Sequence, residues 1–437
     1  MSKPGAPREM RFSRDIDAYP ANARAWQAEH NVEASEEINA LFGYGSQFAK
    51  THGFYIDGVD ERTAMLPRDW RSRRGAALAG WLRAPPARRN HPHYDTNRRT
   101  HPLNGPNPGG RSLNGSKLVL VGGAGLIGSH VADALTAEDV GEIVVFDNFV
   151  RGAKDNLRHA LTDSRVRIID GDIRDLEALS TAFEGADGVF HFAALWLLEC
   201  HEQPRAAFDV NIQGTFNVIE ACRDQDVGRL VYSSSASVYG DAAEEPMSEG
   251  HPYNNTNFYG ATKVASEQMC RAFHHRYGLN YAGLRYMNVY GPRQDYEGAY
   301  VAVIMKMLDA VDRGEPLVVF GDGSQSYDFV YVQGCARANV LAMKTDSEDR
   351  FYNVGTGIRT SIKELAALIV RLTGTNRPVR YEPAGQTFVR NRIGCPERAA
   401  AEIGFTADVL LEEGLRGVIR WRREQAAESA ERRKTGA

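Results

Sequence analysis

Three polar side chains in the middle of the chain have the types and spacing needed to move a proton on or off an alcohol. Tyr259 and Lys263 are four residues apart, so on a helix they lie on one face. Ser235, twenty-four residues earlier, ends an apolar run and adds a hydroxyl. Oxidation of an alcohol to a ketone by hydride transfer needs a base for the hydroxyl proton, and the pKa of a tyrosine, ordinarily about 10, must fall for it to serve. We expect the ammonium group of Lys263 to lower it.

A glycine-rich turn predicts where the hydride acceptor binds. Gly122, Gly125 and Gly128 form a G-x-x-G-x-x-G pattern between an apolar run and an amphipathic segment. Such glycines let backbone N–H groups at a helix N-terminus approach a pyrophosphate. Asp147, nineteen residues after Gly128, ends the next apolar run, and a carboxylate there accepts hydrogen bonds from a ribose and repels a 2′-phosphate. The pattern therefore predicts an NAD site that disfavours NADP.

Further residues predicted to contact NAD lie beside the glycines or directly after the apolar runs. The positively charged nicotinamide ring of bound NAD is expected to lower the pKa of Tyr259 further, in addition to Lys263. Asp172 and Ile173 are expected beside the adenine ring. The segment Phe192, Ala193 and Ala194 is expected to place small residues and exposed backbone along the dinucleotide. Together these predicted residues are Leu126, Ile127, Asn148, Asp172, Ile173, Phe192, Ala193 and Ala194.

The elements that must position these side chains alternate in type from residue 117 onward. Apolar runs of strand length are each followed by a segment with helical periodicity. Strands alternating with helices indicate β-α-β units and a parallel sheet covered on both faces. The sequence thus predicts an α/β protein with a Rossmann-type doubly wound sheet, with ligands at the carboxyl ends of its strands. The strand-like runs are 117–121, 142–146, 166–169, 188–192 and 229–232.

Composition divides the chain into parts. Residues 117–298 are predicted to form the NAD-binding domain with the catalytic residues, residues 299–425 a smaller C-terminal α/β substrate-binding lobe, and residues 426–437 a tail. Residues 84–116, rich in Pro, Gly and Arg, are predicted to be a linker. Residues 1–83 are expected to form a mostly irregular N-terminal extension of unassigned role. The front part is interpreted either as an arm that binds a partner or as an unstructured extension.

Charge and cysteine content disfavour several classes of protein. The 52 Lys and Arg against 56 Asp and Glu give a net charge of −4, which argues against binding to nucleic acid or to a membrane. The five scattered cysteines suggest neither disulfides nor a zinc knuckle, and no apolar run approaches the roughly 20 residues of a spanning helix. A cytoplasmic protein is expected. No metal site is predicted, because the weak candidates lack a supporting shell: Asp15, Asp17, His91, His93 and His101.

Ten motifs in order resemble the extended short-chain dehydrogenase/reductase superfamily of nucleotide-sugar epimerases and dehydratases. They are GGAGLIG, VVFDN, DGDIRD, HFAAL, NIQGT, SSSASVYG, YGATK, LRYMNVYGPR, FGDGSQSYDFVYV and YNVGTG, and the resemblance covers about residues 117–423. It implies that Ser235, Tyr259 and Lys263 are catalytic, and that Asn211 and Tyr286, with Tyr259 and Lys263, help to bind NAD. It also implies a homodimer, formed through helices near 211–222 and 259–277.

Within this superfamily, details of the sequence favour a resemblance to UDP-glucose 4-epimerases. The 4,6-dehydratases carry an Asp-Glu pair directly after the active hydroxyl, where this chain has Ala236 and Ser237. Reductases of the group use NADPH, which Asp147 disfavours. The resemblance thus implies an NAD-dependent nucleotide-sugar 4-epimerase that oxidises C4 transiently, lets the keto sugar rotate and reduces it again. Two alternatives stay open: another sugar-nucleotide enzyme of the family (dehydratase, decarboxylase or dehydrogenase), or a non-catalytic NAD-binding regulator.

The expected substrate site departs from the family pattern. The family's diphosphate-binding arginine before Asp-Phe is Tyr327 here, and a second basic anchor near Pro383 is missing. A buried diphosphate without cationic partners is costly. Other arginines of the chain are therefore candidates to replace the two missing basic residues. Trp196 stands where 4-epimerases often carry a polar or basic residue. The predicted substrate-binding residues are Ser235, Ser237, Tyr259, Asn288, Arg293, Tyr327, Arg390 and Arg392.

Overall fold

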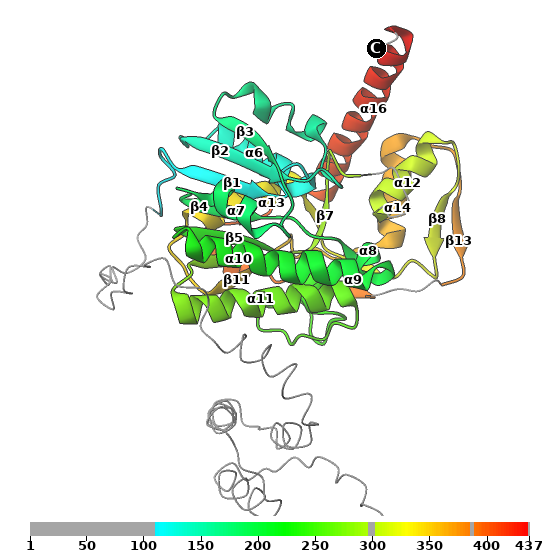
Figure 1. Ribbon diagram of the computed structural model, residues 1–437. Coiled ribbons are helices and arrows are strands. Elements are labelled where there is room, and N and C mark those ends of the chain that lie inside the picture. Colours follow the sequence, from blue (N-terminus) through cyan, green and yellow to red (C-terminus); the bar gives the residue numbers. More distant parts are fainter. Residues whose placement is uncertain (1–109, 296–301, 385–388, 436–437) are drawn as a thin grey trace, which may run out of the picture. The chain divides into compact units, whose positions relative to one another are not determined.

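The computed structural model describes residues 110–295, 302–384 and 389–435 (Figure 1). The predicted N-terminal extension, most of the linker, and the candidate metal ligands Asp15, Asp17, His91, His93 and His101 lie outside these residues. No helix in the described ranges is long and apolar enough to cross a membrane. The described residues also hold no group of three or more His, Cys, Asp or Glu side chains suited to a metal ion.

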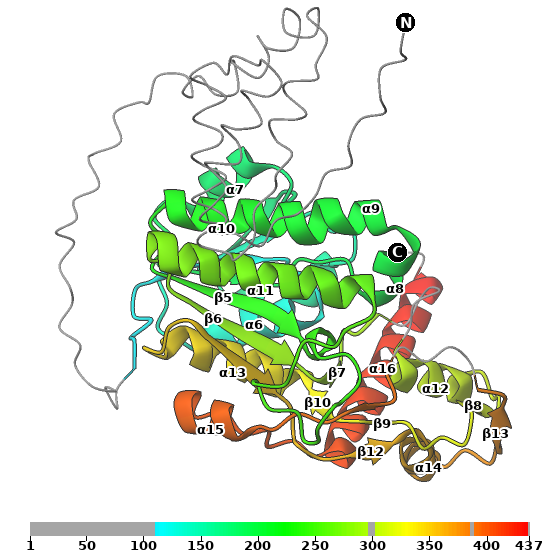
Figure 2. The same ribbon diagram turned by 90° about the horizontal axis from the view of Figure 1, so that it is seen from below.

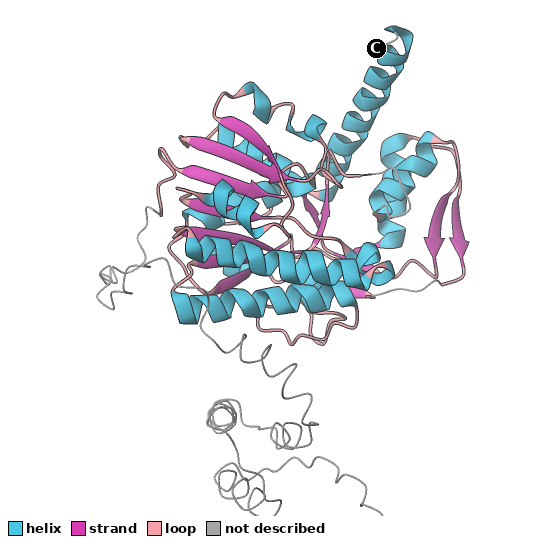
Figure 3. Ribbon diagram, viewed as in Figure 1, coloured by secondary structure: helices cyan, strands magenta, loops and turns pink. Residues whose placement is uncertain are grey.

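A seven-stranded parallel sheet forms the centre of the described chain (Figure 3). Its strands are β1 (Lys117–Val121), β2 (Glu142–Asp147), β3 (Val166–Asp170), β4 (Gly188–His191), β5 (Arg229–Ser235), β6 (Tyr281–Tyr286) and β11 (Arg350–Val354). They lie in the order β11-β6-β5-β4-β1-β2-β3. Four of the five residues of β1 are buried, as expected for a strand covered on both faces. The direction of winding reverses between β1 and β4, and ligands bind at such a switch point.

Helices cover both faces of this sheet (Figures 1 and 2). On one face lie α6 (Leu126–Thr136) and α13 (Val332–Lys344), and they share a hydrophobic cluster with the sheet. On the other face α7 (Leu176–Phe183), α10 (Thr215–Asp224) and α11 (Phe258–Tyr277) enclose a second cluster. The predicted doubly wound α/β fold is therefore confirmed.

The remaining strands form small sheets of two or three members, and further helices pack with them. β7 (Asn288–Tyr290) pairs with β10 (Phe329–Tyr331), β8 (Leu317–Phe320) with β13 (Val379–Glu382), and β9 (Ser326–Tyr327) with both β12 (Thr360–Ser361) and β14 (Asn391–Arg392). The helices are α12 (Val303–Asp312), α14 (Ile362–Thr373), α15 (Glu397–Ile403) and α16 (Leu411–Thr435). A third hydrophobic cluster, which includes Leu308, Leu365 and Leu415, joins α12, α14 and α16.

Two predicted boundaries differ from the observed elements. The range 299–425, predicted as a smaller lobe, contains β11, which is an edge strand of the main sheet, and α13, which packs on one face of that sheet. In the sheet Phe351 of β11 lies opposite Gly283 of β6, where a Cβ atom would come within 2.2 Å of the Phe351 ring. Sequence periodicity indicates a strand but does not say which sheet it joins. The tail predicted from residue 426 continues α16 as far as Thr435.

Candidate active site

Two adjoining clefts lie where strands β1, β2 and β4 end, at the switch point of the sheet. Their volumes are about 300 and 380 Å³. They share Gly122, Gly125, Arg151, Phe192 and Ala194. Every residue predicted to bind the cofactor, with the exception of Asn211, lines one or both of them. The dispersed sequence signals thus converge on one continuous depression.

The glycine-rich turn has the geometry of a phosphate cradle. Gly122 has a φ of +78°, and a Cβ there would come within 2.5 Å of the Ala193 backbone nitrogen. Gly128 is also fixed by packing, since its Cβ would meet the Gly122 oxygen at 2.6 Å. Gly125 is different: the nearest atom to its Cβ would be 3.4 Å away. It precedes α6 with no side-chain cap, so the start of this helix is open to an anion.

Asp147 ends β2 at the wall of the larger cleft. Its Oδ2 accepts a hydrogen bond from the Ala124 backbone N–H at 2.9 Å, and its Oδ1 accepts one from Phe149 at 2.8 Å. Burial raises the pKa of Asp147. Beside it the Asn148 side chain donates to Asp172 (2.9 Å). A carboxylate held by backbone amides in this wall suits recognition of ribose hydroxyls.

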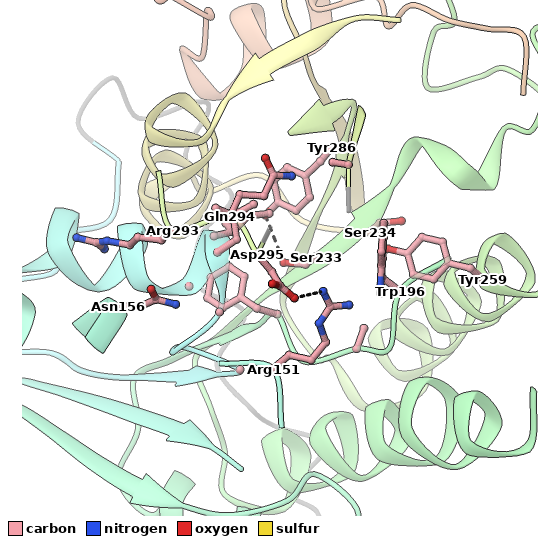
Figure 4. A pocket seen from close by; sticks show the side chains of 18 of the residues that line it. Arg151, Asn156, Trp196, Ser233, Ser234, Tyr259, Tyr286, Arg293, Gln294 and Asp295 are labelled. Atoms are coloured by element: carbon pink, nitrogen blue, oxygen red, sulfur yellow. Dashed lines mark hydrogen bonds and ion pairs between the residues drawn. The ribbon is translucent and has the colours of Figure 1, made fainter. Parts of the chain in front are cut away.

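The three proposed reacting side chains lie together. Ser235 ends β5 and caps the short helix η4 (Ala236–Val238), while Tyr259 and Lys263 lie in the first two turns of α11. The Ser235 side chain is near enough to the Tyr259 hydroxyl to lower its pKa. Lys263 Nζ donates to the Ser233 carbonyl at 2.7 Å and lies 5.7 Å from the centre of the Tyr259 ring. Figure 4 shows Tyr259 beside Ser234 and Trp196 in the smaller cleft.

The charges of this cluster follow from its burial. Burial raises the pKa of Tyr259 to about 12, although the nearby Ser235 side chain acts to lower it. Burial lowers the pKa of Lys263 to about 8. At neutral pH the lysine is therefore mostly charged, while the phenol keeps its proton. The cluster can hold a proton beside the cleft and release it when more positive charge arrives.

Two of the residues implied by the resemblance act at the edge of the clefts. Asn211, in the π-helical turn η3 (Phe208–Gly214), accepts from the Leu195 N–H at 2.7 Å and donates to the Leu195 carbonyl at 2.8 Å. It also donates to Thr262 of α11 at 3.2 Å. Asn211 thus fixes a loop that lines the larger cleft. Tyr286 lines the smaller cleft, and its hydroxyl accepts from Asn339 at 2.8 Å.

The clefts also contain a cationic group that the sequence analysis does not single out. Arg151 lines both clefts, and its guanidinium lies 5.2 Å from the centre of the Trp196 ring (Figure 4). It pairs with Glu199 of α8 (Leu197–Glu202) at 3.0 Å and with Asp295 at 3.4 Å. These partners are 48 and 144 residues away in sequence, so only the fold reveals the contact. The sequence signal is a single basic residue shortly after Asp147.

The predicted substrate-binding residues are distributed unevenly. Arg293 and Tyr259 line the smaller cleft, and Arg293 pairs with Asp133 of α6 at 2.6 Å. Its backbone has a φ of +67°. The other predicted residues lie outside the walls of both clefts: Ser235, Ser237, Asn288, Tyr327, Arg390 and Arg392.

Comparison with known proteins gives consistent matches over the described domain. Residues 118–355 match the model of the NAD dependent epimerase/dehydratase family. A UDP-glucose 4-epimerase of Mycolicibacterium smegmatis is 32% identical over 71% of this chain and 99% of its own length. A UDP-N-acetyl-alpha-D-glucosaminuronate decarboxylase of Bacillus cytotoxicus is 30% identical over 70% of this chain and 98% of its own.

Solved structures agree with these matches. A UDP-N-acetylglucosamine 4-epimerase from Methanobrevibacter ruminantium, in complex with UDP-N-acetylmuramic acid, is 32% identical with a TM-score of 0.68, over 71% of this chain and 99% of that one. A UDP-glucose 4-epimerase of Thermus thermophilus, in complex with NAD, is 32% identical with a TM-score of 0.64, over 70% and 99%.

Proposed function

Because the chain belongs to the NAD dependent epimerase/dehydratase family, we propose that it is a 4-epimerase of UDP-sugars. The observation that carries the proposal is the cluster of Ser235, Tyr259 and Lys263 beside a cleft suited to a dinucleotide. Epimerases of UDP-sugars among the similar proteins support the substrate class. Ala236 and Ser237, in place of an acidic pair, argue against elimination of water.

NAD is the cofactor of this family, and it supplies a hydride acceptor that returns the hydride within one turnover. The residues of this chain fit it. The uncapped start of α6 and the space kept open by Gly125 suit the pyrophosphate. Asp147 suits the adenosine ribose, and Tyr259 and Lys263 lie at the other end of the continuous cleft.

The proposed cycle assigns one task to each residue of the cluster. Tyr259, as phenolate, removes the proton from the sugar 4-hydroxyl while C4 loses its hydride. Ser235 donates a hydrogen bond to the oxygen as it becomes a ketone. The keto sugar then rotates and takes the hydride on its opposite face, and Tyr259 returns the proton to oxygen. Lys263 keeps its positive charge near the phenolate throughout.

Proton NMR of the full chain with a panel of nucleotide sugars tests this function. The panel contains UDP-glucose, UDP-galactose, UDP-N-acetylglucosamine and UDP-glucuronate, each with and without added NAD. We expect interconversion of C4 epimers with no net formation of NADH. Loss of the uronate carboxyl group would instead establish the decarboxylase alternative, which the relative from Bacillus cytotoxicus favours. No turnover by a protein that still binds NAD would favour the non-catalytic regulator.

We further propose that the protein is a homodimer formed through α10 and α11, which lie side by side on one face of the sheet (Figure 2). Large apolar side chains on and beside these helices are partly exposed: Phe208 is 40%, Phe216 38% and Tyr277 38% exposed. Exposed aromatic residues on neighbouring helices are typical of an interaction surface.

A further inference from the structure

Arg392 lies on the short strand β14, directly beside Tyr327. β14 and β9 run parallel, and in their register Arg392 is the partner of Tyr327. The Tyr327 hydroxyl donates to the Val389 carbonyl at 2.9 Å, so the tyrosine is fixed by its own hydrogen bond to the segment that leads into β14. A basic group is therefore present next to position 327, supplied by the neighbouring strand.

Arg392 is partly buried, and its guanidinium has fewer partners in the described part of the chain than two fully buried arginines have. Arg285 pairs with Glu267 at 2.7 Å, and Arg229 donates to the carbonyls of Ala342 (2.8 Å) and Ser347 (2.9 Å). The Nε of Arg392 is buried with no hydrogen-bond partner, and Arg392 forms no ion pair within the part of the chain that the structure describes. Burial lowers the pKa of Arg392. A buried guanidinium nitrogen without a partner is costly, and the rest of the group is accessible, which indicates that its partner is a ligand.

Two neighbours limit where that ligand lies. The charge of Arg392 lowers the pKa of Tyr259, so the guanidinium is within electrostatic reach of the proposed base. The carboxylate of Asp241 also acts on Arg392, but it is not within ion-pairing distance and accepts a hydrogen bond from the Arg390 backbone N–H at 2.7 Å instead. The protein thus leaves Arg392 free for an anionic group beside the reacting phenol.

We propose that Arg392 binds an anionic oxygen of the sugar nucleotide and replaces the cation that position 327 lacks. This inference rests on the proposed function for its substrate class. Two groups have the required chemistry, the diphosphate and a carboxylate carried by the sugar. Both accept hydrogen bonds from the planar fork of an arginine.

Binding of UDP alone, measured by calorimetry on the full chain, separates the two sources of charge and needs no epimerase activity. If the diphosphate is the partner, Arg392→Gln weakens UDP binding about tenfold or more, on the scale of a lost charged hydrogen bond, and Arg392→Lys recovers part of it. If a sugar carboxylate is the partner, UDP binding is unchanged, and the preference for UDP-glucuronate over UDP-glucose falls by a similar factor. Unchanged affinity for all three ligands would overturn the proposal.

The matched control is Arg380→Gln, which removes the same charge from an exposed position on β13 and is expected to leave binding within about twofold of the wild type. Melting temperature and NAD content identify variants that fail to fold. A second measurement uses the unmodified protein: phenylglyoxal labels arginine, and mass spectrometry reports the label at Arg392. Protection by UDP, or by UDP-glucuronate but not UDP, supports the proposal, and no protection by either contradicts it. A protein that binds UDP through Arg392 yet epimerises no sugar would retain this inference and lose the proposed function.

Discussion

At the scale of single residues, the charge of Tyr259 is the quantity that the site must control. Lowering its pKa from about 12 to about 7 requires about 7 kcal/mol of charge stabilisation. A unit charge at 5.7 Å, the distance from Lys263 Nζ to the ring centre, supplies about 3 kcal/mol at an effective dielectric constant of about 20. Lys263 alone is therefore insufficient. We expect the phenol to lose its proton only when the cationic nicotinamide ring is bound as well.

Replacement of Tyr259 by Phe tests the assigned base. Tyr259→Phe removes the hydroxyl but keeps the ring that lines the cleft, so we expect epimerisation to fall by about a hundredfold or more. NAD released on denaturation should equal that of the wild type. Turnover within a few-fold of the wild type, measured by NMR with the best substrate of the panel, would remove Tyr259 from the mechanism.

Replacement of Asp147 tests the choice of cofactor. Asp147→Ala removes the expected ribose contact and the charge that repels a 2′-phosphate, so NAD affinity should fall about tenfold and NADP should bind. Fluorescence titration with both cofactors measures the change. Asp147→Asn separates the effects, because it removes the charge and keeps a side-chain acceptor for the Ala124 or Phe149 amide. An unchanged preference in both variants would mean that the carboxylate does not select the cofactor.

At the scale of elements, the contact between β4 and α10 contains a buried histidine. His191 ends β4, is 1% exposed, and its Nε2 lies 2.9 Å from the Thr215 hydroxyl. Burial, with a smaller effect of the Lys263 charge, lowers the pKa of His191 to about 3. Between pH 6.5 and 3 the unfolded chain binds a proton at this residue and the folded chain does not. Stability therefore decreases as the pH falls through this range.

The His191 contribution predicts a pH-dependent difference between two proteins. At pH 5 the wild type should have lost about 2 kcal/mol of its free energy of unfolding through His191, which corresponds to about 1.5 pKa units. His191→Gln keeps a hydrogen-bonding group for Thr215 and does not titrate, so its loss between pH 7.5 and 5 should be smaller by that amount. Urea unfolding at both pH values measures the difference. Equal losses in the two proteins would show that His191 is not the titrating group.

At the scale of the whole molecule, the surface of α10 and α11 predicts self-association. Phe216 of α10 packs edge-on against Phe273 of α11, with 5.6 Å between ring centres. Its side chain is 38% exposed, so a charge introduced at this position would face a partner bound to this surface. The centre of a protein interface is depleted in charged residues and enriched in aromatic ones, which suits Phe216. The chain is therefore expected to be a dimer.

Light scattering coupled to size-exclusion chromatography tests the dimer. Phe216→Glu should reduce the measured mass to that of one chain, because the interface would have to bury an unpaired carboxylate. Phe320→Glu is the matched control, since Phe320 is 53% exposed on β8, away from these helices, and this variant should remain a dimer. A Phe216→Glu protein with the mass of two chains would place the interface elsewhere.

The sequence by itself predicts the parallel sheet and the cofactor-binding residues, because these depend on local patterns. Continuous apolar runs are stable only as strands covered on both faces, and a glycine-rich turn between a strand and a helix has few other structures available. Gly122 follows β1, Asp147 ends β2 and Ala193 comes shortly after β4, and these three strands are neighbours in the sheet, so the three residues meet at one edge. The cluster of Ser235, Tyr259 and Lys263 can likewise be predicted from the sequence, because Tyr259 and Lys263 share one face of a helix.

Other features depend on contacts between distant segments, which periodicity does not encode. The pairing of β11 with β6, the grouping of Arg151 with Glu199 and Asp295, and the register of Arg392 with Tyr327 each join segments at least 48 residues apart in sequence. Desolvation is also a tertiary property. The raised pKa of Tyr259 and the unpartnered Nε of Arg392 exist only because packing removes water from these groups, and no spacing of residues along the chain predicts how completely it does so.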